Sequence, residues 1–285
     1  MLTDTQAPPL ERATQPVPAE RPTAFQSNLN LTRELAVTAF KLKYTGSVLG
    51  YAWSLVKPLL IFGMTYLVFA VFLLKGRTSR SENFPVELLL GVVVWTFFAD
   101  ATVSSVSAIA GNGHMIRKAY FPRWIPVIAS TLSATMTLAV NMSLMFAVGI
   151  PLGWFQTGWH TLLLPLLFVE LYFLVVGIAL LLSALFVFYR DLGHVWEISL
   201  QLLFYGSAIV FPFTLIPARF RTLLAFNPMA QIVEDMRRAV VTTAIPWSGQ
   251  ILGGWTVVPF LAVLAVFGLG FYVFRRLTPR FGEAI

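Results

Sequence analysis

Long apolar runs constrain this chain more than any other feature of its sequence. A helix needs about 20 apolar residues to cross the roughly 30 Å hydrocarbon core of a membrane. Because backbone polar groups in hydrocarbon must be satisfied within the spanning segment, such runs favour helices. They recur at residues 51–74, 84–110, 125–152, 160–188, 198–216 and 255–274. The sequence therefore predicts an all-α polytopic membrane protein with six transmembrane helices and no sizeable soluble domain.

The charge balance narrows the class of protein further. Only 12% of the residues are charged, whereas soluble domains carry about 25%. The formal net charge of +7 comes mostly from short loops beside the apolar runs, where basic residues set topology and meet anionic headgroups. Nucleic-acid binding is therefore disfavoured. The absence of cysteine excludes disulfides, thiolate metal sites and cysteine catalysis.

The region before the first run divides into two parts. Residues 1–24 are rich in Pro, Thr, Ala, Glu and Gln, a composition that has little to bury and predicts a disordered tail. Residues 28–44 place apolar side chains at helical spacing beside Arg33, Lys41 and Lys43. This pattern predicts an amphipathic helix in the membrane interface. A soluble juxtamembrane helix is the alternative.

The distribution of basic residues gives an orientation. Six crossings place both termini on one side, and the loops on that side carry ten Lys and Arg residues against seven on the other. The excess favours cytoplasmic termini. The seven include Arg219, Arg221, Arg237 and Arg238, which belong to one long connection before the last span.

That connection is patterned like a helical hairpin at residues 217–245. One helical segment runs from Pro217 to Phe226, Asn227 and Pro228 form a turn, and a second helix follows with Glu234 four residues ahead of Arg238. We expect a re-entrant hairpin at the outer face, with Asn227, Pro228 and Arg237 as its functional positions. A hairpin lying on the surface is the alternative.

The sequence lacks the usual motifs of phosphate binding, metal binding and catalysis. The chain has no Gly-x-x-x-x-Gly-Lys-Ser/Thr loop for binding phosphates. Its histidines, His114, His160 and His194, fall in three different loops without a carboxylate at ligand spacing. We therefore predict no catalytic residue, no metal site and no cofactor in this chain.

Four ionisable residues lie in or near the apolar runs, where a buried charge is costly and marks a functional candidate. Lys57 and Glu87 are near span ends, from which their side chains can reach the interface, and Asp100 lies in the inner half of its run. Glu170 is near the middle of its run. It has either a transport role or a polar partner on another helix.

Two further patterns have a functional and a structural interpretation. Tyr66, Phe69 and Phe72 repeat at three-residue spacing, so they form a stripe that would stack on the C–H faces of sugars or pack against lipid and core. Residues 112–124, NGHMIRKAYFPRW, combine apolar and basic side chains between two spans. They would contact a soluble motor subunit or only fix topology.

Four ordered stretches resemble one family. The stretch KYTGSVLGYAWSLVKPLL (43–60) is similar to that family's approach to the first span, with matching positions Tyr44, Ser47, Leu49, Gly50, Trp53 and Pro58. The others are 112–127, with Ile116, Arg117, Lys118, Phe121 and Pro122; FYRDLGHV (188–195); and LAFNPMAQIVEDMRRAV (224–240). Together they resemble the membrane subunit of type-2 ABC exporters, especially the permeases that export O-antigen and related polysaccharides.

The resemblance implies an assembly and roles. Residues 25–285 would form a single transmembrane permease domain, paired as a homodimer with two copies of a separate nucleotide-binding ATPase that carries ATP and Mg²⁺. Residues 28–44 would be a gate helix, and Arg33, Lys41 and Lys43 would meet the pyrophosphate of a lipid-linked glycan. Tyr66, Phe69, Phe72 and Glu170 would line the glycan path. Residues 112–123 would be a coupling helix, contacting the ATPase through His114, Met115, Ile116, Arg117, Lys118, Tyr120 and Phe121.

The predicted function is outward movement of a lipid-linked polysaccharide across the bacterial cytoplasmic membrane. Teichoic acid or a small glycolipid is the alternative cargo. An ion-coupled secondary transporter using Glu170 and Asp100 is the alternative of another class, although no inverted internal repeat is visible. A membrane glycosyltransferase would require a polar catalytic cluster at a span end, which the sequence does not show.

Overall fold

The computed structural model describes residues 24–46, 50–73, 83–113, 122–156, 158–213 and 216–284. Within these ranges the chain is helical and contains no strand. Five segments are long and apolar enough to cross a membrane: Gly50–Phe72, Phe84–Val106, Ile125–Gly149, Trp159–Phe186 and Val257–Arg280. The predicted all-α, multi-pass class is confirmed.

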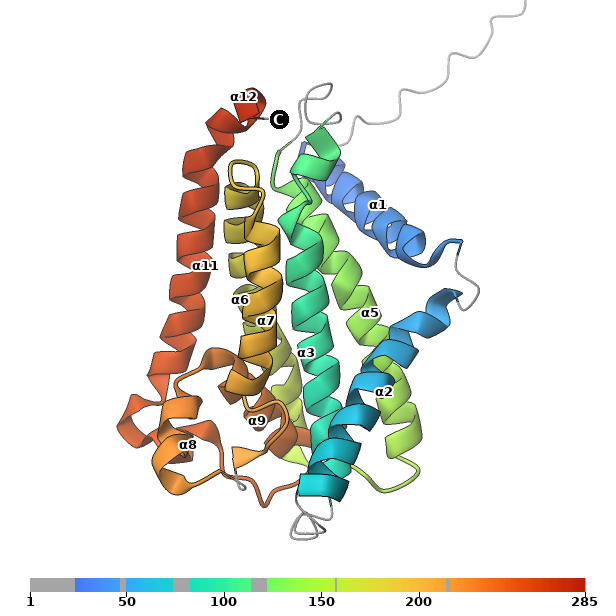
Figure 1. The fold of residues 1–285 in the computed structure, drawn as a ribbon, viewed down its shortest axis with the longest axis vertical. Helices are drawn as coiled ribbons and strands as arrows, with labels where there is room; N and C mark the ends of the chain where they lie inside the picture. The colour runs from blue at the N-terminus through green and yellow to red at the C-terminus, as the bar shows by residue number, and fades with distance from the viewer. Residues whose placement is uncertain are drawn as a thin grey trace, which may run out of the picture.

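The long helices stand side by side, as Figure 1 shows. They are α2 (Trp53–Tyr66), α3 (Phe84–Val106), α5 (Ile125–Gly149), α6 (Leu164–Phe186), α7 (Leu192–Gly206) and α11 (Val257–Leu277). Short helical turns extend them: η1 (Gly50–Ala52), the π-helix η2 (Leu67–Leu73), η4 (Ala110–Asn112), η5 (Trp159–Leu163), η7 (Gly253–Trp255), η8 (Thr278–Arg280) and α12 (Phe281–Ala284).

Helix α1 (Ala24–Tyr44) slants along the outside of this bundle and packs against α5. The predicted helix at 28–44 is therefore present and begins four residues earlier. The first turn of α1 lies at the same end of the molecule as α12 and the C-terminus, which is the upper end in Figure 1.

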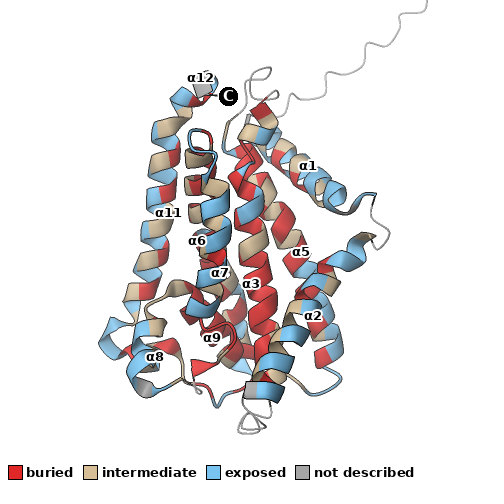
Figure 2. Cartoon of the chain, viewed as in Figure 1, coloured by how far each residue is buried: buried red, intermediate tan, exposed pale blue. Residues whose placement is uncertain are grey.

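Burial separates the helices into a central and a peripheral set, which Figure 2 displays. In α3, 78% of the most apolar stretch is buried, against 11% for Gly50–Phe72. Helix α7 has Leu200 as its one buried residue. Helix α3 is thus the core of the subunit, whereas α2 and α7 expose apolar surface to lipid or to another chain.

Helices α6 and α11 approach each other closely because two glycines face each other. A Cβ atom at Gly177 would lie 2.6 Å from the Cα of Phe267, and one at Gly270 would overlap the carbonyl of Gly177. Small residues let membrane helices pack backbone to backbone. This crossing holds α11 against the bundle.

The predicted bounds of the span at 198–216 are wrong. Helix α7 begins at Leu192 and ends at Gly206, and its 15 residues extend only about 22 Å. The following segment, residues 207–213, is irregular although most of it is buried, and Ala208 adopts a positive φ of 54°. A sixth span of the predicted kind is not confirmed.

The predicted hairpin is built from two helices, α8 (Ala218–Ala225) and α9 (Pro228–Val240), followed by α10 (Ser248–Leu252). Asn227 caps α9, since its side-chain oxygen accepts from the Met229 N–H at 3.0 Å, and Pro228 occupies the first helical position. The hairpin lies at the lower end of the molecule in Figure 1, opposite the chain terminus.

Candidate functional site

An open cleft of about 670 Å³ lies between α1, α3 and α5. Its walls are the C-terminal part of α1, the second half of α3 and the first half of α5. Leucine and alanine side chains form its apolar part. Its polar lining comprises Thr38, Lys43, Asp100, Ser104, Ser107, Asn112, Ser130 and Ser133.

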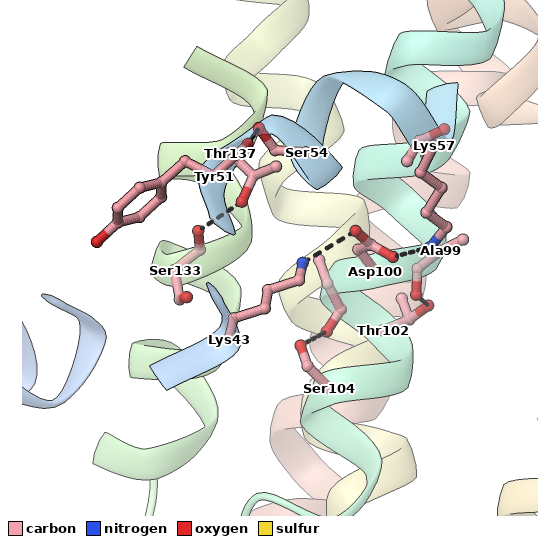
Figure 3. A network of polar contacts seen from close by, with 12 residues as sticks. Lys43, Tyr51, Ser54, Lys57, Ala99, Asp100, Thr102, Ser104, Ser133 and Thr137 are labelled. Atoms are coloured by element: carbon pink, nitrogen blue, oxygen red, sulfur yellow. Dashed lines mark hydrogen bonds and ion pairs between the residues drawn. The ribbon is translucent and has the colours of Figure 1, made fainter. Parts of the chain in front are cut away.

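Three charged side chains meet beside this cleft, and we call Lys43, Lys57 and Asp100 the Asp100 cluster. Lys43 Nζ donates to Asp100 Oδ2 at 3.0 Å, and Lys57 Nζ donates to Asp100 Oδ1 at 2.7 Å. Figure 3 shows the two ammonium groups approaching the carboxylate from different helices. The cluster therefore links α1, α2 and α3.

The cluster is only partly shielded from solvent. The side chains of Lys43 and Lys57 are 39% and 54% exposed, and that of Asp100 is 17% exposed. The two ammonium groups share this one carboxylate. Because exposed ion pairs are weak, an incoming phosphate oxyanion can compete with Asp100 for the lysines.

The structure separates the three residues predicted to meet a pyrophosphate. Lys43 lines the cleft, whereas Arg33 and Lys41 do not. Successive residues of an α-helix are rotated by about 100°, so Lys41 and Lys43 leave α1 on nearly opposite sides. The structure therefore does not bring Arg33, Lys41 and Lys43 together in this cleft, and their contact with a pyrophosphate stays a prediction.

The structure adds Lys57 and Asp100 in their place. Lys57 does not simply extend to the interface, since its ammonium group pairs with Asp100. The available signal in the sequence was a single basic residue, Lys57, in the first apolar run and an acidic residue, Asp100, well inside the second. The serines lining the cleft offered a second signal, because Ser104 and Ser107, like Ser130 and Ser133, are spaced three residues apart and share a helix face.

The aromatic stripe is divided between packing and exposure. The Tyr66 ring lies 6.4 Å, centre to centre, from that of Phe84 at the start of α3, and Phe69 makes an edge contact with Phe211 at 4.9 Å. Phe72 is 63% exposed. The described contacts therefore place two of the three rings against the bundle.

Glu170 lies in the first third of α6 and is 8% exposed. Neither of its carboxyl oxygens has a hydrogen-bond partner of normal geometry in the described part of the chain, although Gln231 and Asp235 of α9 lie beside it. Asp235 accepts from Ser248 N at 2.8 Å, Ser248 Oγ at 2.6 Å and Gln231 Nε2 at 2.9 Å. Burial nevertheless raises the pKa of the Asp235 carboxyl.

Arg237 is fully buried and joins the hairpin to the bundle. Its guanidinium donates to Glu234 Oε2 at 3.0 Å and to the carbonyls of Glu87 at 3.0 Å, Ala208 at 3.0 Å and Ile209 at 2.6 Å. We call Glu234, Arg237 and the carbonyls that Arg237 binds the Arg237 cluster. It satisfies the backbone of the irregular segment after α7, which would otherwise be costly to bury.

The Arg237 cluster corrects three predictions. Glu234 pairs with Arg237, three residues on, and its other oxygen accepts from Phe213 N at 2.8 Å. Arg238 instead donates to the carbonyl of Ile245. Glu87 does not reach an interface, since it is 1% exposed. Arg237 is not a loop charge, so it does not belong in the count that gives topology.

The residues predicted to contact an ATPase lie outside the described residues. This applies to His114, Met115, Ile116, Arg117, Lys118, Tyr120 and Phe121. The structure describes only the flanks, of which η4 ends at Asn112 and α5 begins at Ile125. Both flanks lie at the upper end of the molecule in Figure 1, near α12.

Comparison with known proteins identifies relatives over most of the chain. The O-antigen export system permease protein RfbA of Klebsiella pneumoniae is 26% identical over 256 residues, which are 86% of this chain and 91% of the relative. The protein of that name from Myxococcus xanthus is 26% identical over 209 residues, 72% of this chain and 78% of the relative. The polysialic acid transport protein KpsM of Escherichia coli is 28% identical over 198 residues, 68% of this chain and 74% of the relative.

The model of a transporter family matches residues 30–241. This range includes most of α1, the Asp100 cluster and both α8 and α9. The chain therefore belongs to the family of ABC-2 type transporters.

Proposed function

We propose that this chain is the permease subunit of an ATP-driven exporter that moves a lipid-linked polysaccharide outward across the bacterial cytoplasmic membrane. The names of the relatives, which concern O-antigen export and polysialic acid transport, support this class of cargo. The observation that carries the proposal is the cleft between α1, α3 and α5, whose wall holds Lys43 and Asp100, with Lys57 bound to the same carboxylate.

The cleft suits the anionic head of a lipid-linked glycan. In the proposal, the pyrophosphate displaces Asp100 from Lys43 and Lys57, because both oxyanions accept the same charge-assisted hydrogen bonds. The serine hydroxyls and Asn112 hold sugar hydroxyls, and Leu35 and Leu42 contact the lipid. Loss of the lysine contacts frees α1 from α3, so arrival of cargo loosens the gate helix.

A second copy of the chain completes the path. Helix α2, its extension η2 and helix α7 expose apolar and aromatic side chains, among them Met64, Phe72 and Tyr205. A homodimer that pairs these faces would enclose a path that includes Tyr66, Phe69 and Phe72. Glu170 lies on α6 beside α9 and would act on the hairpin at the exit of the path.

The proposed energy source is a separate nucleotide-binding subunit in two copies, which holds ATP and Mg²⁺, so this chain is a transport subunit and not an enzyme. Residues 112–123 would transmit its movement. Closure of the ATPase dimer shifts the population of permease conformations by binding one of them more tightly.

The proposed topology keeps both termini cytoplasmic. Helix α7 and residues 207–213 together make the fifth of the six crossings, and the hairpin lies at the outer face. Arg237 is buried and is therefore not counted as a loop charge, so the cytoplasmic loops carry ten basic residues and the outer loops six. The excess of basic residues on the cytoplasmic side, which this orientation requires, is thus larger than the sequence count gave.

Export by purified protein tests the proposal. The chain is reconstituted in liposomes with a candidate nucleotide-binding ATPase, and ATP-dependent movement of a labelled polyprenyl-pyrophosphate glycan is measured. We expect Lys43→Ala to reduce movement at least tenfold and Lys41→Ala, two residues away but outside the cleft, to leave it near wild type. Equal activity of the two variants would contradict the role of the cleft. Absence of any complex with the ATPase would contradict the exporter itself.

A further inference from the structure

A second concavity, of about 660 Å³, opens between α5, α6 and α11. Most of its lining is apolar: Trp124, Ile128, Val176, Leu180, Phe267, Phe271 and Phe274. Its charged residues, Arg123 and Arg275, lie together with Thr278 where α5 begins and α11 ends. We call this concavity the α11 groove.

Sequence spacing explains the apolar walls. Phe267, Phe271 and Phe274 are four and three residues apart on α11, so they share one face of that helix. Val176 and Leu180 on α6, like Trp124 and Ile128 at the start of α5, are four residues apart. The backbone contact between Gly177 and Gly270 closes α6 against α11 beside the groove. The groove is thus part of the packed subunit.

The two arginines at its end have no acidic partner among the side chains that the structure describes. Arg123 donates to the carbonyl of Thr278 and its guanidinium lies 6.0 Å from the centre of the Phe281 ring. Arg275 is exposed. Neither forms an ion pair with a carboxylate of the described chain. The polar end of the groove therefore carries two positive charges.

The position of these charges fits a membrane interface. They lie at the ends of two candidate spans, Ile125–Gly149 and Val257–Arg280, and Trp124 beside them is 40% exposed. Tryptophan and arginine are enriched at this depth, where aromatic rings and cationic side chains meet headgroups. The apolar groove runs from there into the spanning part of α6 and α11.

We propose that the α11 groove binds an anionic glycerophospholipid of the surrounding leaflet, with one acyl chain along the phenylalanines and the phosphate at Arg123 and Arg275. A sugar or nucleotide would find almost no polar lining along the walls. A second copy docking by the same face would bring arginines against arginines, because a two-fold interface pairs a patch with itself. An anionic lipid supplies both the chain and the missing charge.

Arg275 and Arg276 provide a matched test of the headgroup contact. The full chain is placed in bilayer discs of phosphatidylcholine with 20% phosphatidylglycerol, roughly the density of an anionic leaflet, extracted mildly, and its retained lipid is measured by native mass spectrometry. We expect wild type to retain phosphatidylglycerol over phosphatidylcholine and Arg275→Gln to lose that preference about fivefold, the effect of one basic residue at a membrane surface. Arg276→Gln, next in sequence and bonded to the Tyr272 hydroxyl outside the groove, should retain it.

Ile128 provides the test of the acyl chain. Ile128→Trp fills the groove from α5 and should lower retention of phosphatidylglycerol, whereas Leu269→Trp, on α11 outside the groove and 53% exposed, should not. Thermal unfolding in phosphatidylcholine alone checks that each variant is folded. Equal retention of the two lipids by wild type, or an unchanged preference in Arg275→Gln, overturns the proposal. A change in self-association in Ile128→Trp without a lipid preference would instead make the groove an interface between copies.

Discussion

Two clusters join basic and acidic side chains in this subunit, and they differ in almost every physical respect. In the Arg237 cluster the side chains of Arg237 and Glu234 are both 0% exposed. In the Asp100 cluster the two lysine side chains are 39% and 54% exposed. One cluster satisfies buried backbone of α3 and the segment after α7, whereas the other holds α1 and α2 to α3 beside an open cleft.

The difference separates a structural lock from a reversible contact. Removing one partner of a buried pair leaves a charge without compensation, which costs about 3–5 kcal/mol. An exposed pair contributes about 0–1 kcal/mol and can exchange partners at little cost. The hairpin is therefore fixed by its charges, whereas the weaker contacts of α1 with Asp100 are compatible with the proposed release of α1 by a competing anion.

The largest expected effect comes from Arg237. Arg237→Ala leaves Glu234 and three backbone carbonyls without their donor, so we expect the free energy of unfolding to fall by about 3–5 kcal/mol. Thermal unfolding in detergent and the yield of monodisperse protein measure it. Arg219→Ala is the control, because Arg219 is exposed and stacks only on Phe220. If Arg237→Ala were as stable as wild type, the two clusters would not differ in their contribution to stability.

Gly91 allows the Arg237 cluster to be disturbed without removing a charge. A Cβ atom there would lie 2.7 Å from Arg237 Nη2 and 3.0 Å from the carbonyl of Ile209. We expect Gly91→Ala to destabilise by about 1–3 kcal/mol, as overpacking does. Gly63→Ala on α2, where a Cβ would meet nothing within 4 Å, should stabilise by up to about 1 kcal/mol. The same unfolding assay compares the two variants. If Gly91→Ala were more stable than wild type, the Arg237 side chain would be able to shift without losing its hydrogen bonds.

Substitution in the Asp100 cluster should have little effect on stability. Asp100→Asn removes the charge that both lysines share, and we expect a loss of about 0–1 kcal/mol. A double-mutant cycle with Lys43→Ala, measured by thermal unfolding, gives the coupling between the two side chains. A coupling above about 2 kcal/mol would show that the Asp100 cluster, like the Arg237 cluster, stabilises the fold strongly. Export should change far more than stability, which the reconstituted assay tests.

The smallest expected effect concerns pH and Asp235. Its pKa is raised by burial, so between the ordinary aspartate value of about 3.9 and the raised one the folded state keeps a proton that the unfolded state has lost. Stability then decreases as pH rises through this window, and the decrease ends above the raised pKa. Subtracting the unfolding curve of Asp235→Asn from that of wild type across pH isolates this term. A difference that grows with pH in the stabilising direction would show that the hydrogen bonds from Ser248 and Gln231 prevail.

Much of the fold could be predicted because a bilayer requires each spanning segment to be apolar, about 20 residues long and hydrogen-bonded within itself. Five of the six apolar runs correspond to helices long enough to cross it, and the helices of the hairpin follow from the turn at Asn227 and Pro228. The run at 198–216 misled the prediction because its second half is apolar for another reason. Residues 207–213 are buried against protein as irregular backbone, and hydropathy does not distinguish that from a helix in lipid.

The candidate site was predictable only in part. Lys43 was identified from the basic surface of α1, but the sequence offered no reason to prefer it over Arg33 or Lys41. Lys57 and Asp100 are 43 residues apart, and the acceptor carbonyl of Glu87 is 150 residues from Arg237. Such pairs depend on which helix faces which, and helical periodicity gives a face without naming its neighbour.

The membrane environment, the all-α class and the family could be inferred from the sequence, because runs of about 20 apolar residues and ordered short motifs are local properties of the chain. The tertiary structure decided which charges compensate each other. It alone shows that Arg237 is an internal donor and that one carboxylate serves two lysines, since in a low-dielectric interior each charge is stabilised only by the partner that packing brings to it.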